Sequence, residues 1–170
     1  MGGKGPARGP AAEDDMPEFA VKEVGATPYL FVEQTSAMDP DEIARAMGAA
    51  FGAVLGFMQR EAIAPAGPPL AVYHEHDPTR LKFRAGLIVR PGDLHKAEAP
   101  VLGETIPAGR VLHFVHKGPY ATLRDDYDAM MVHLAAEGLT LGSPTWEVYV
   151  DDPGEVPEAD LLTEVYTRLG

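Results

Sequence analysis

The feature that most constrains the fold of this chain is an order of elements that occurs twice. Each half is predicted to hold a strand, a helix, a Gly/Pro-rich exit and two more strands, the first of which ends in a tyrosine before an Asp-Pro loop. Phe51 and Tyr127 stand at similar distances before the exits at Gly67 and Gly142. Unrelated segments rarely share so many landmarks in one order, so we interpret the two halves as an internal duplication.

Both predicted helices have sequence signals at their ends and one apolar face. The first runs from Asp39-Pro40 to Glu61, because Asp39 suits the N-cap and proline suits the first helical turn. The second ends near Glu137, with Gly138 at the C′ position. The apolar positions recur every three or four residues, which predicts packing against a sheet or a pocket. They are Ile43, Met47, Ala50, Phe51, Val54 and Met58 in the first helix, and Leu123, Tyr127, Met130 and Leu134 in the second.

Strands are predicted wherever β-branched and aromatic residues stand between turn signals. In the first half these are residues 19–24 and 29–34, expected to form a hairpin, and residues 70–74 and 81–90 after the helix. In the second half they are residues 110–116, 145–150 and 161–168, and residues 100–109 are expected to be a connection. The pattern predicts an α+β fold with a pseudo-twofold antiparallel sheet, both helices on one face and a central groove.

Composition narrows the class of protein. We predict one domain at residues 18–170, with repeats at about 18–95 and 100–170, after a disordered tail at residues 1–17 rich in Gly, Pro and Ala. The chain of 170 residues has a formal net charge of −12 and no cysteine. Negative charge disfavours nucleic acid and anionic lipid, and disulfides and thiolate metal sites are excluded. No signal peptide or membrane span is evident, so a cytoplasmic protein is expected.

Two glutamates in the last two predicted strands most need an explanation. Glu147 shares a strand face with Tyr149, and Glu164 shares one with Tyr166. If these faces point inward, each carboxylate is buried among rings, where it needs a cationic partner or a proton. A pocket for a cation, or for acid and base chemistry, is one explanation, and a solvent-facing position is the other. Trp146 falls on the opposite face from Glu147, which also fits a place in the core.

Three motifs in the second half carry a family resemblance. HKGPY (residues 116–120) precedes the second helix, E-x-Y with a following D-P spans residues 147–153, and T-E-x-Y spans residues 163–166. In this order and spacing they resemble the GyrI-like small-molecule-binding domain, which also serves as the effector-binding domain of AraC- and MerR-type transcription regulators. The resemblance covers residues 19–169. It implies a duplicated β-α-β-β module, the SHS2 duplication, in agreement with the repeat.

The resemblance also implies a function. It predicts a groove, of the multidrug-binding kind, for a hydrophobic or cationic small molecule, lined by aromatic residues around a central acid. The family's central glutamate falls on Glu164, which is expected near the pseudo-twofold axis, with Ala85 as its counterpart in the first half. The expected ligand-binding residues are Glu164, Glu147, Tyr149, Tyr120, Trp146, Tyr73, Tyr166, Phe51 and Met58.

Two alternatives stay open beside a pure binder. Some stand-alone GyrI-like proteins are hydrolases of cyclopropane-bearing genotoxins, and the expected catalytic residues would then be Glu164 and Tyr149. Other members bind DNA gyrase, and an acidic chain could act as a protein-level modulator of that enzyme.

Neither a cofactor nor a metal is expected. The run His74-Glu75-His76-Asp77 has no further ligand at a fitting spacing, and His113 and His116 point to opposite faces of one strand. The sequence also lacks a phosphate-binding glycine loop and the common nucleophile and zinc motifs.

Overall fold

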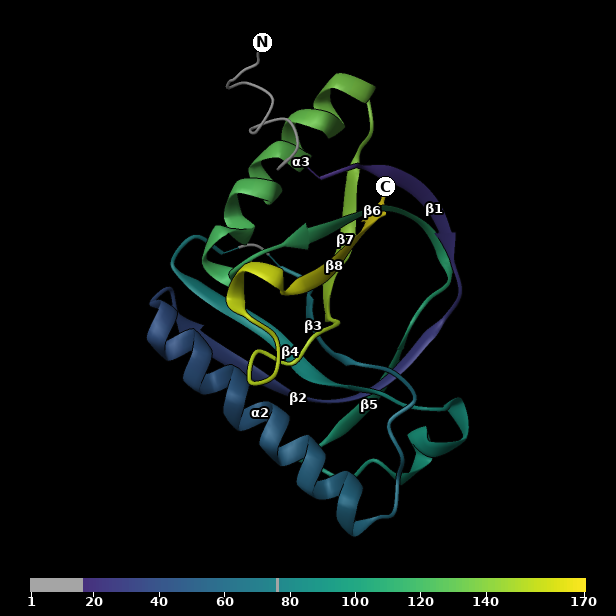
Figure 1. Cartoon of the computed structure of the whole chain (residues 1–170). Coiled ribbons are helices and arrows are strands. Elements are labelled where there is room, and N and C mark those ends of the chain that lie inside the picture. The colour runs from purple at the N-terminus through teal and green to yellow at the C-terminus, as the bar shows by residue number, and fades with distance from the viewer. Residues whose placement is uncertain (1–16, 76) are drawn as a thin grey trace.

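The computed structural model describes residues 17–75 and 77–170. Its centre is an antiparallel sheet, eight-stranded within these residues, in the order β1-β6-β8-β7-β3-β4-β2-β5 (Figure 1). The strands are β1 (Ala20–Val24), β2 (Thr27–Ala37), β3 (Pro69–Tyr73), β4 (Arg80–Ile88), β5 (Leu102–Ile106), β6 (Gly109–Lys117), β7 (Leu141–Tyr149) and β8 (Leu162–Leu169). The longer helices are α2 (Pro40–Arg60) and α3 (Leu123–Glu137), and short 3-10 helices are η1 (Pro91–Lys96), η2 (Tyr120–Thr122) and η3 (Glu158–Asp160).

The two halves of the chain repeat each other around the middle of the sheet. The first half consists of β2, α2, β3 and β4, the second of β6, α3, β7 and β8, and β3 lies beside β7. Ala71 and Glu147 face each other across that boundary. Each of them stands two residues before the tyrosine that ends its strand, Tyr73 or Tyr149. The pseudo-twofold axis therefore passes between Ala71 and Glu147.

Both long helices cover the same face of the sheet. Directly paired residues of antiparallel strands point to one face. One such row crosses six strands through Phe114, Val165, Glu147, Ala71, Ala85 and Val32. At one end Phe114 and Val165 pack with α3, and at the other Ala85 packs with α2. The predicted α+β fold, with a duplicated module and two helices on one face, is confirmed.

The helix ends follow the sequence signals. The side chain of Asp39 accepts a hydrogen bond from the Glu42 backbone N–H at 3.1 Å, which caps α2. Gly138 ends α3 with a φ of 66°, in the left-handed region that glycine adopts without a steric penalty. These local signals therefore place both helices within a residue or two.

The face of the sheet away from the helices holds a second apolar core. Its buried residues come from both halves and from the outer strands: Tyr29, Phe31, Leu70, Val72, Ile106, Val111, Trp146 and Val148. Because both faces bury apolar side chains, several strands read as nearly continuous hydrophobic runs. Within the described residues, no helix is long and apolar enough to cross a membrane.

Two predictions about the outer strands are wrong. Residues 19–24 and 29–34 do not form a hairpin, because β1 pairs with β6 while β2 pairs with β4 and β5. Only Gly25 and Ala26 separate β1 from β2, and the chain runs on from the α3 side of the molecule to the α2 side (Figure 1). The connection predicted at residues 100–109 contains β5. Each half thus receives its outermost strand from the segment that precedes the other half.

Candidate functional site

Glu147 is a buried carboxylate at the centre of the helix-covered face. The residue is 7% exposed. The hydroxyl of Tyr127 on α3 donates to its Oε2 at 2.6 Å, and the hydroxyl of Tyr149 on β7 donates to its Oε1 at 2.7 Å. Tyr149 reaches the carboxylate because residues two apart on a strand share a face. Both oxygens of the acid are therefore held by phenol groups.

The charge of Glu147 is poorly compensated by the protein. Burial raises the pKa of Glu147, and hydrogen bonds from Tyr127, Tyr149 and Tyr73, together with the charge of His116, lower it in part. Within the described residues, no ion pair joins Glu147 to a lysine or an arginine. A buried acid without a basic partner is a suitable contact for a cationic ligand or a proton.

The tyrosines around Glu147 remain hydrogen-bond donors. Burial and the negative charge of Glu147 raise the pKa of Tyr127, Tyr149 and Tyr73 well above the usual value for a phenol. At neutral pH all three are protonated, so their hydroxyl groups stabilise the ionised form of the acid.

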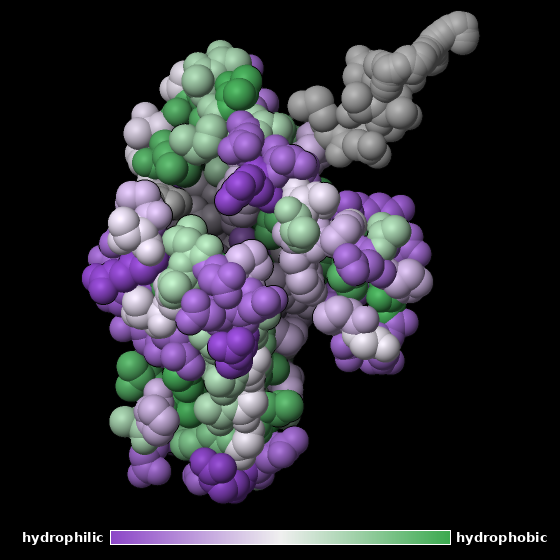
Figure 2. All heavy atoms as spheres, turned by 90° about the vertical axis from the view of Figure 1, so that its left-hand side faces the viewer, coloured by the Kyte–Doolittle hydropathy of each residue, from purple (hydrophilic) through white to green (hydrophobic). Residues whose placement is uncertain are grey.

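Aromatic rings bridge the two helices over this part of the sheet. Phe51 of α2 packs edge-on against Tyr149 with ring centroids 6.2 Å apart, and Tyr120 of η2 does the same from the α3 side at 5.6 Å. Tyr120 is 41% exposed, so the end of this row of three rings that lies on the α3 side faces solvent. The side of the molecule that carries the helices is hollowed between its upper and lower parts, and both hydrophilic and hydrophobic residues border the hollow (Figure 2). Rings in such a place attract flat or cationic molecules.

The HKGPY motif positions Tyr120. His116 is buried, and its Nδ1 lies 2.5 Å from Asp126 Oδ2 while its Nε2 lies 2.9 Å from the carbonyl oxygen of Pro119. These two contacts, one to α3 and one to the residue before η2, fix the orientation of the ring. Gly118 has a φ of 124°, which side chains of L-residues rarely adopt. The motif therefore joins β6 to α3 and holds the turn that presents Tyr120.

Thr163 adds an unpaired polar atom to the same face. It pairs with His116 and Tyr149 across the strands, so its side chain points toward the helices. Its hydroxyl is fully buried and has no hydrogen-bond partner within the described residues. An unpaired buried hydroxyl costs about 1–3 kcal/mol, so Thr163 is an energetically unfavourable feature of this face.

The structure divides the predicted ligand-binding residues between the two faces. Glu147, Tyr149, Tyr120, Tyr73 and Phe51 lie on the helix-covered face. Glu164, Trp146 and Tyr166 lie on the opposite face. Met58 is 1% exposed and belongs to the apolar core beneath α2.

Three predictions about Glu164 are therefore corrected. Glu164 pairs with Val148, the neighbour of Glu147, so the two acids point in opposite directions and do not share one groove. Glu164 also lies one strand away from the pseudo-twofold axis, beside which Glu147 stands. Because the sheet separates Glu164 from Tyr149, these two residues cannot act together on one reacting atom.

The first-half counterpart of Glu164 is Arg84 and not Ala85. Arg84 pairs with Val72 as Glu164 pairs with Val148, and Val72 and Val148 each precede the tyrosine that ends their strand. Ala85 faces α2. The two halves are thus chemically unequal, with a cation at one position and an anion at its equivalent.

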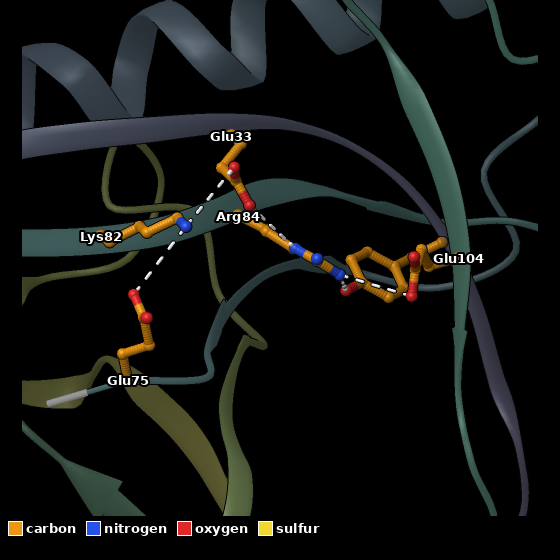
Figure 3. A network of polar contacts seen from close by, with 6 residues as sticks. Glu33, Glu75, Lys82, Arg84 and Glu104 are labelled. Carbon is orange, nitrogen blue, oxygen red and sulfur yellow. Dashed lines mark hydrogen bonds and ion pairs between the residues drawn. The ribbon is translucent and has the colours of Figure 1, made fainter.

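Arg84 is already neutralised by a polar network. Its Nε lies 3.3 Å from Glu33, its Nη1 lies 3.5 Å from Glu104, and the same Nη1 donates to the Tyr29 hydroxyl at 3.3 Å (Figure 3). Lys82 extends the network by a further contact to Glu33 at 3.9 Å. The partners come from β2, β4 and β5, so the network joins these strands. Each charged group of the network contacts one of opposite sign.

Sequence reasoning missed Tyr127 and Thr163 as site residues and placed Tyr127 only in the apolar stripe of the second helix. The available signal was the position of Tyr127 in the apolar stripe of α3, because a hydroxyl in a core needs a polar partner. Thr163 could be assigned to this face only from the pairing of β8 with β6 and β7. The histidine run at residues 74–77 includes His76, which lies outside the described residues, so its expected lack of metal stays a prediction.

Comparisons with known proteins agree with this fold. The family model described as the GyrI-like small molecule binding domain matches residues 17–169. A search of curated proteins found no match. The C-terminal domain of EcmrR has a TM-score of 0.74 and 20% identity over 91% of this chain and 98% of its own. A hydrolase encoded by lin2189 from Listeria innocua has a TM-score of 0.59 and 15% identity over 92% of both chains.

A third similar structure is SAV2435 bound to tetraphenylphosphonium, with a TM-score of 0.58 and 11% identity over 90% of this chain and 94% of its own. At these levels of identity the likeness to solved structures shows the fold alone. The match to the family model covers nearly all of the chain.

Proposed function

Because the chain belongs to the GyrI-like small molecule binding domain family, we propose that it binds a hydrophobic cation in the groove between α2 and α3. The observation that carries this proposal is the environment of Glu147. This acid is buried beside the pseudo-twofold axis, both of its oxygens are held by tyrosines, and it lacks a basic partner within the described residues.

Two attractions favour a cation over a neutral ligand. A positive charge near Glu147 gains Coulomb energy in a medium less polar than water. The faces of Tyr120 and Tyr149 add cation–π contacts of about 0.5–2 kcal/mol each. A neutral ligand would bury the charge of Glu147 further and return no compensation. The cation bound to SAV2435 supports this choice, because that protein has the same fold.

The experiment is a calorimetric titration with tetraphenylphosphonium and with triphenylphosphine oxide, its uncharged analogue. Glu147→Gln keeps the shape of the side chain and removes the charge, so we expect the affinity for the cation to fall at least about tenfold, or ~1.4 kcal/mol. The affinity for the oxide should change little. Glu98→Gln, at an exposed position outside the helices and strands, is the matched control. An unchanged affinity in Glu147→Gln would remove this acid from the site.

A second candidate function is hydrolysis of a reactive, cyclopropane-bearing compound. The observation that favours it is a carboxyl group with a raised pKa in direct contact with two phenol hydroxyls. A carboxyl group whose pKa is raised can exchange a proton with a substrate or a water molecule beside it. In this case Glu147 and Tyr149 take the roles that the sequence suggested for Glu164 and Tyr149. The lin2189 protein, named a hydrolase, has the same fold.

Product analysis separates the two candidates. The protein is incubated with a cyclopropane-bearing alkylator, and products are followed by mass spectrometry. An enzyme forms product in excess over protein and loses this activity in Glu147→Gln. A binder protects the compound at no more than one equivalent and forms no product.

A further inference from the structure

The face of the sheet away from the helices has a cavity of about 370 Å³ beside β7 and β8. Its lining includes Ala26 of the β1–β2 connection, Pro68, Ile88, Trp146, Glu164 and Tyr166. Glu147 points to the other side of the sheet, so this cavity is separate from the groove between the helices. Its volume is near the lower end of the range of about 300–1,000 Å³ for small-molecule sites.

A stacked pair of aromatic rings forms one wall of the cavity. Trp146 and Tyr166 are directly paired across β7 and β8, and their rings stack with centroids 5.2 Å apart and an interplanar angle of 14°. His113, the partner of Tyr166 on β6, continues this row at 4.7 Å. Apolar side chains such as Ile88 and Val148 complete the walls. The wall is therefore aromatic and apolar, which suits a ligand that carries an aromatic ring.

Glu164 is the charged group of this cavity, and only one of its oxygens is occupied. His113 Nε2 lies 3.0 Å from Oε1 and the Tyr166 hydroxyl donates to the same atom at 3.2 Å. Because the carboxylate is an acceptor, Nε2 carries the hydrogen. Within the described residues Oε2 has no hydrogen bond. The side chain is 34% exposed and lines the cavity, so Oε2 is accessible to a donor.

Neither of the two groups that contact Glu164 Oε1 supplies a positive charge at pH 7. Burial, and secondarily the charge of Lys22, lower the pKa of His113, while Glu164 raises it in part, so the histidine is neutral at pH 7. Burial and the charge of Glu164 raise the pKa of Tyr166 to about 12, so this group is a neutral donor too. No lysine or arginine in the described part of the chain forms an ion pair with Glu164.

We propose that this cavity is a second ligand-binding site, selective for a flat aromatic amine whose ammonium group binds Glu164 and whose ring packs on Trp146 and Tyr166. The single acid selects one positive charge. The stacked wall selects a planar ring over a bulky cation such as tetraphenylphosphonium. This site goes beyond the function proposed for the groove and does not depend on Glu147.

Trp146 provides a direct signal for the test, because it is the single tryptophan of the chain and forms part of the cavity wall. The full chain is titrated with 2-phenylethylamine and with 2-phenylethanol, which lacks the charge, while the emission of Trp146 is recorded. We expect a saturable change with the amine and an affinity about tenfold weaker for the alcohol, since a charged hydrogen bond is lost.

Three variants decide the outcome. Glu164→Gln should remove the preference for the amine, and Glu147→Gln should leave it unchanged. Ala26→Phe, at the exposed rim, should block the cavity and remove the response of Trp146 to both compounds. A response that is absent from the unmodified chain, that survives in Ala26→Phe, or that depends on Glu147 and not on Glu164 would overturn the proposal. Binding of tetraphenylphosphonium, measured in parallel, reports on the groove separately.

Discussion

The same tripeptide, Glu-Val-Tyr, occurs on β7 at residues 147–149 and on β8 at residues 164–166, and the two copies meet different surroundings. In both, the tyrosine hydroxyl donates to the glutamate two residues before it. Glu147 points toward the helices and accepts a second hydrogen bond from Tyr127 of α3. Glu164 points to the other face and forms its second hydrogen bond with His113 of β6.

The register of the two strands produces this difference. Glu147 pairs with Val165, and Val148 pairs with Glu164, so the tripeptides are offset by one residue. An offset of one residue sends the two acids to opposite faces of a sheet. The helices then bury one of them deeply and leave the other partly exposed. The tripeptide therefore determines that a tyrosine hydroxyl contacts a glutamate. The pairing of β7 with β8 determines which face of the sheet these two groups lie on.

The largest expected effect comes from adding a second acid beside the axis. Ala71→Glu places a carboxylate directly opposite Glu147 at a fully buried position. Two buried acids without a cation cannot both ionise, so we expect the free energy of unfolding at pH 7 to fall by more than about 3 kcal/mol. Denaturant unfolding measures this loss.

The loss in Ala71→Glu should shrink as the pH falls. The added acid has a folded-state pKa above its unfolded value, so the protonated form stabilises the fold and the penalty grows as the pH rises through the folded pKa. Ala37→Glu, at the exposed end of β2, is the control and should change stability by less than about 0.5 kcal/mol. A similar loss in both variants would contradict the view that burial near Glu147 is the cause.

A smaller effect is expected from removing one tyrosine hydroxyl on each face. Tyr127→Phe leaves an oxygen of the buried Glu147 without a donor, and we expect a loss of about 1–3 kcal/mol. Tyr166→Phe leaves the partly exposed Glu164 in contact with water and His113, so its loss should be below about 1 kcal/mol. Thermal and denaturant unfolding compare the two. Equal losses would mean that the faces do not differ in polarity.

The smallest expected effect is the response of groove binding to pH. Burial raises the pKa of Glu147, so in the range from its usual value of about 4.3 up to the raised value the acid is partly protonated in the folded protein. The affinity for tetraphenylphosphonium should fall as the pH drops through this range, by less than about tenfold per unit. Titrations at several pH values measure it, and the slope should be absent in Glu147→Gln.

Much of the fold was readable from local sequence. Asp39 and Gly138 marked the ends of the helices, and periodic apolar residues marked their buried faces. The edge strands were less readable. β5 is short and lies where prolines and glycines suggest a loop, and β1 pairs with β6, which lies about half the chain away. Pairing over such a distance leaves no local signal.

The candidate site was readable in its residue types but not in its grouping. The sequence indicated that glutamates and tyrosines on the last strands were the chemically important groups. The sequence predicted that Glu164 lies near the pseudo-twofold axis. In the structure Ala71 and Glu147 are paired at that axis, so Glu147 occupies this position. Tyr127 was placed only in the apolar stripe of its helix, because its contact with Glu147 crosses from α3 to β7.

By itself, the sequence determined the elements, their duplication and the two Glu-Val-Tyr tripeptides, because helix caps, periodicity and turns act over a few residues. Only the tertiary structure decided which glutamate lies beside the pseudo-twofold axis and which lines a cavity on the other face. The physical reason is that the face of a strand residue depends on registry with distant strands and on which face the helices cover, and both arise only when the two halves pair.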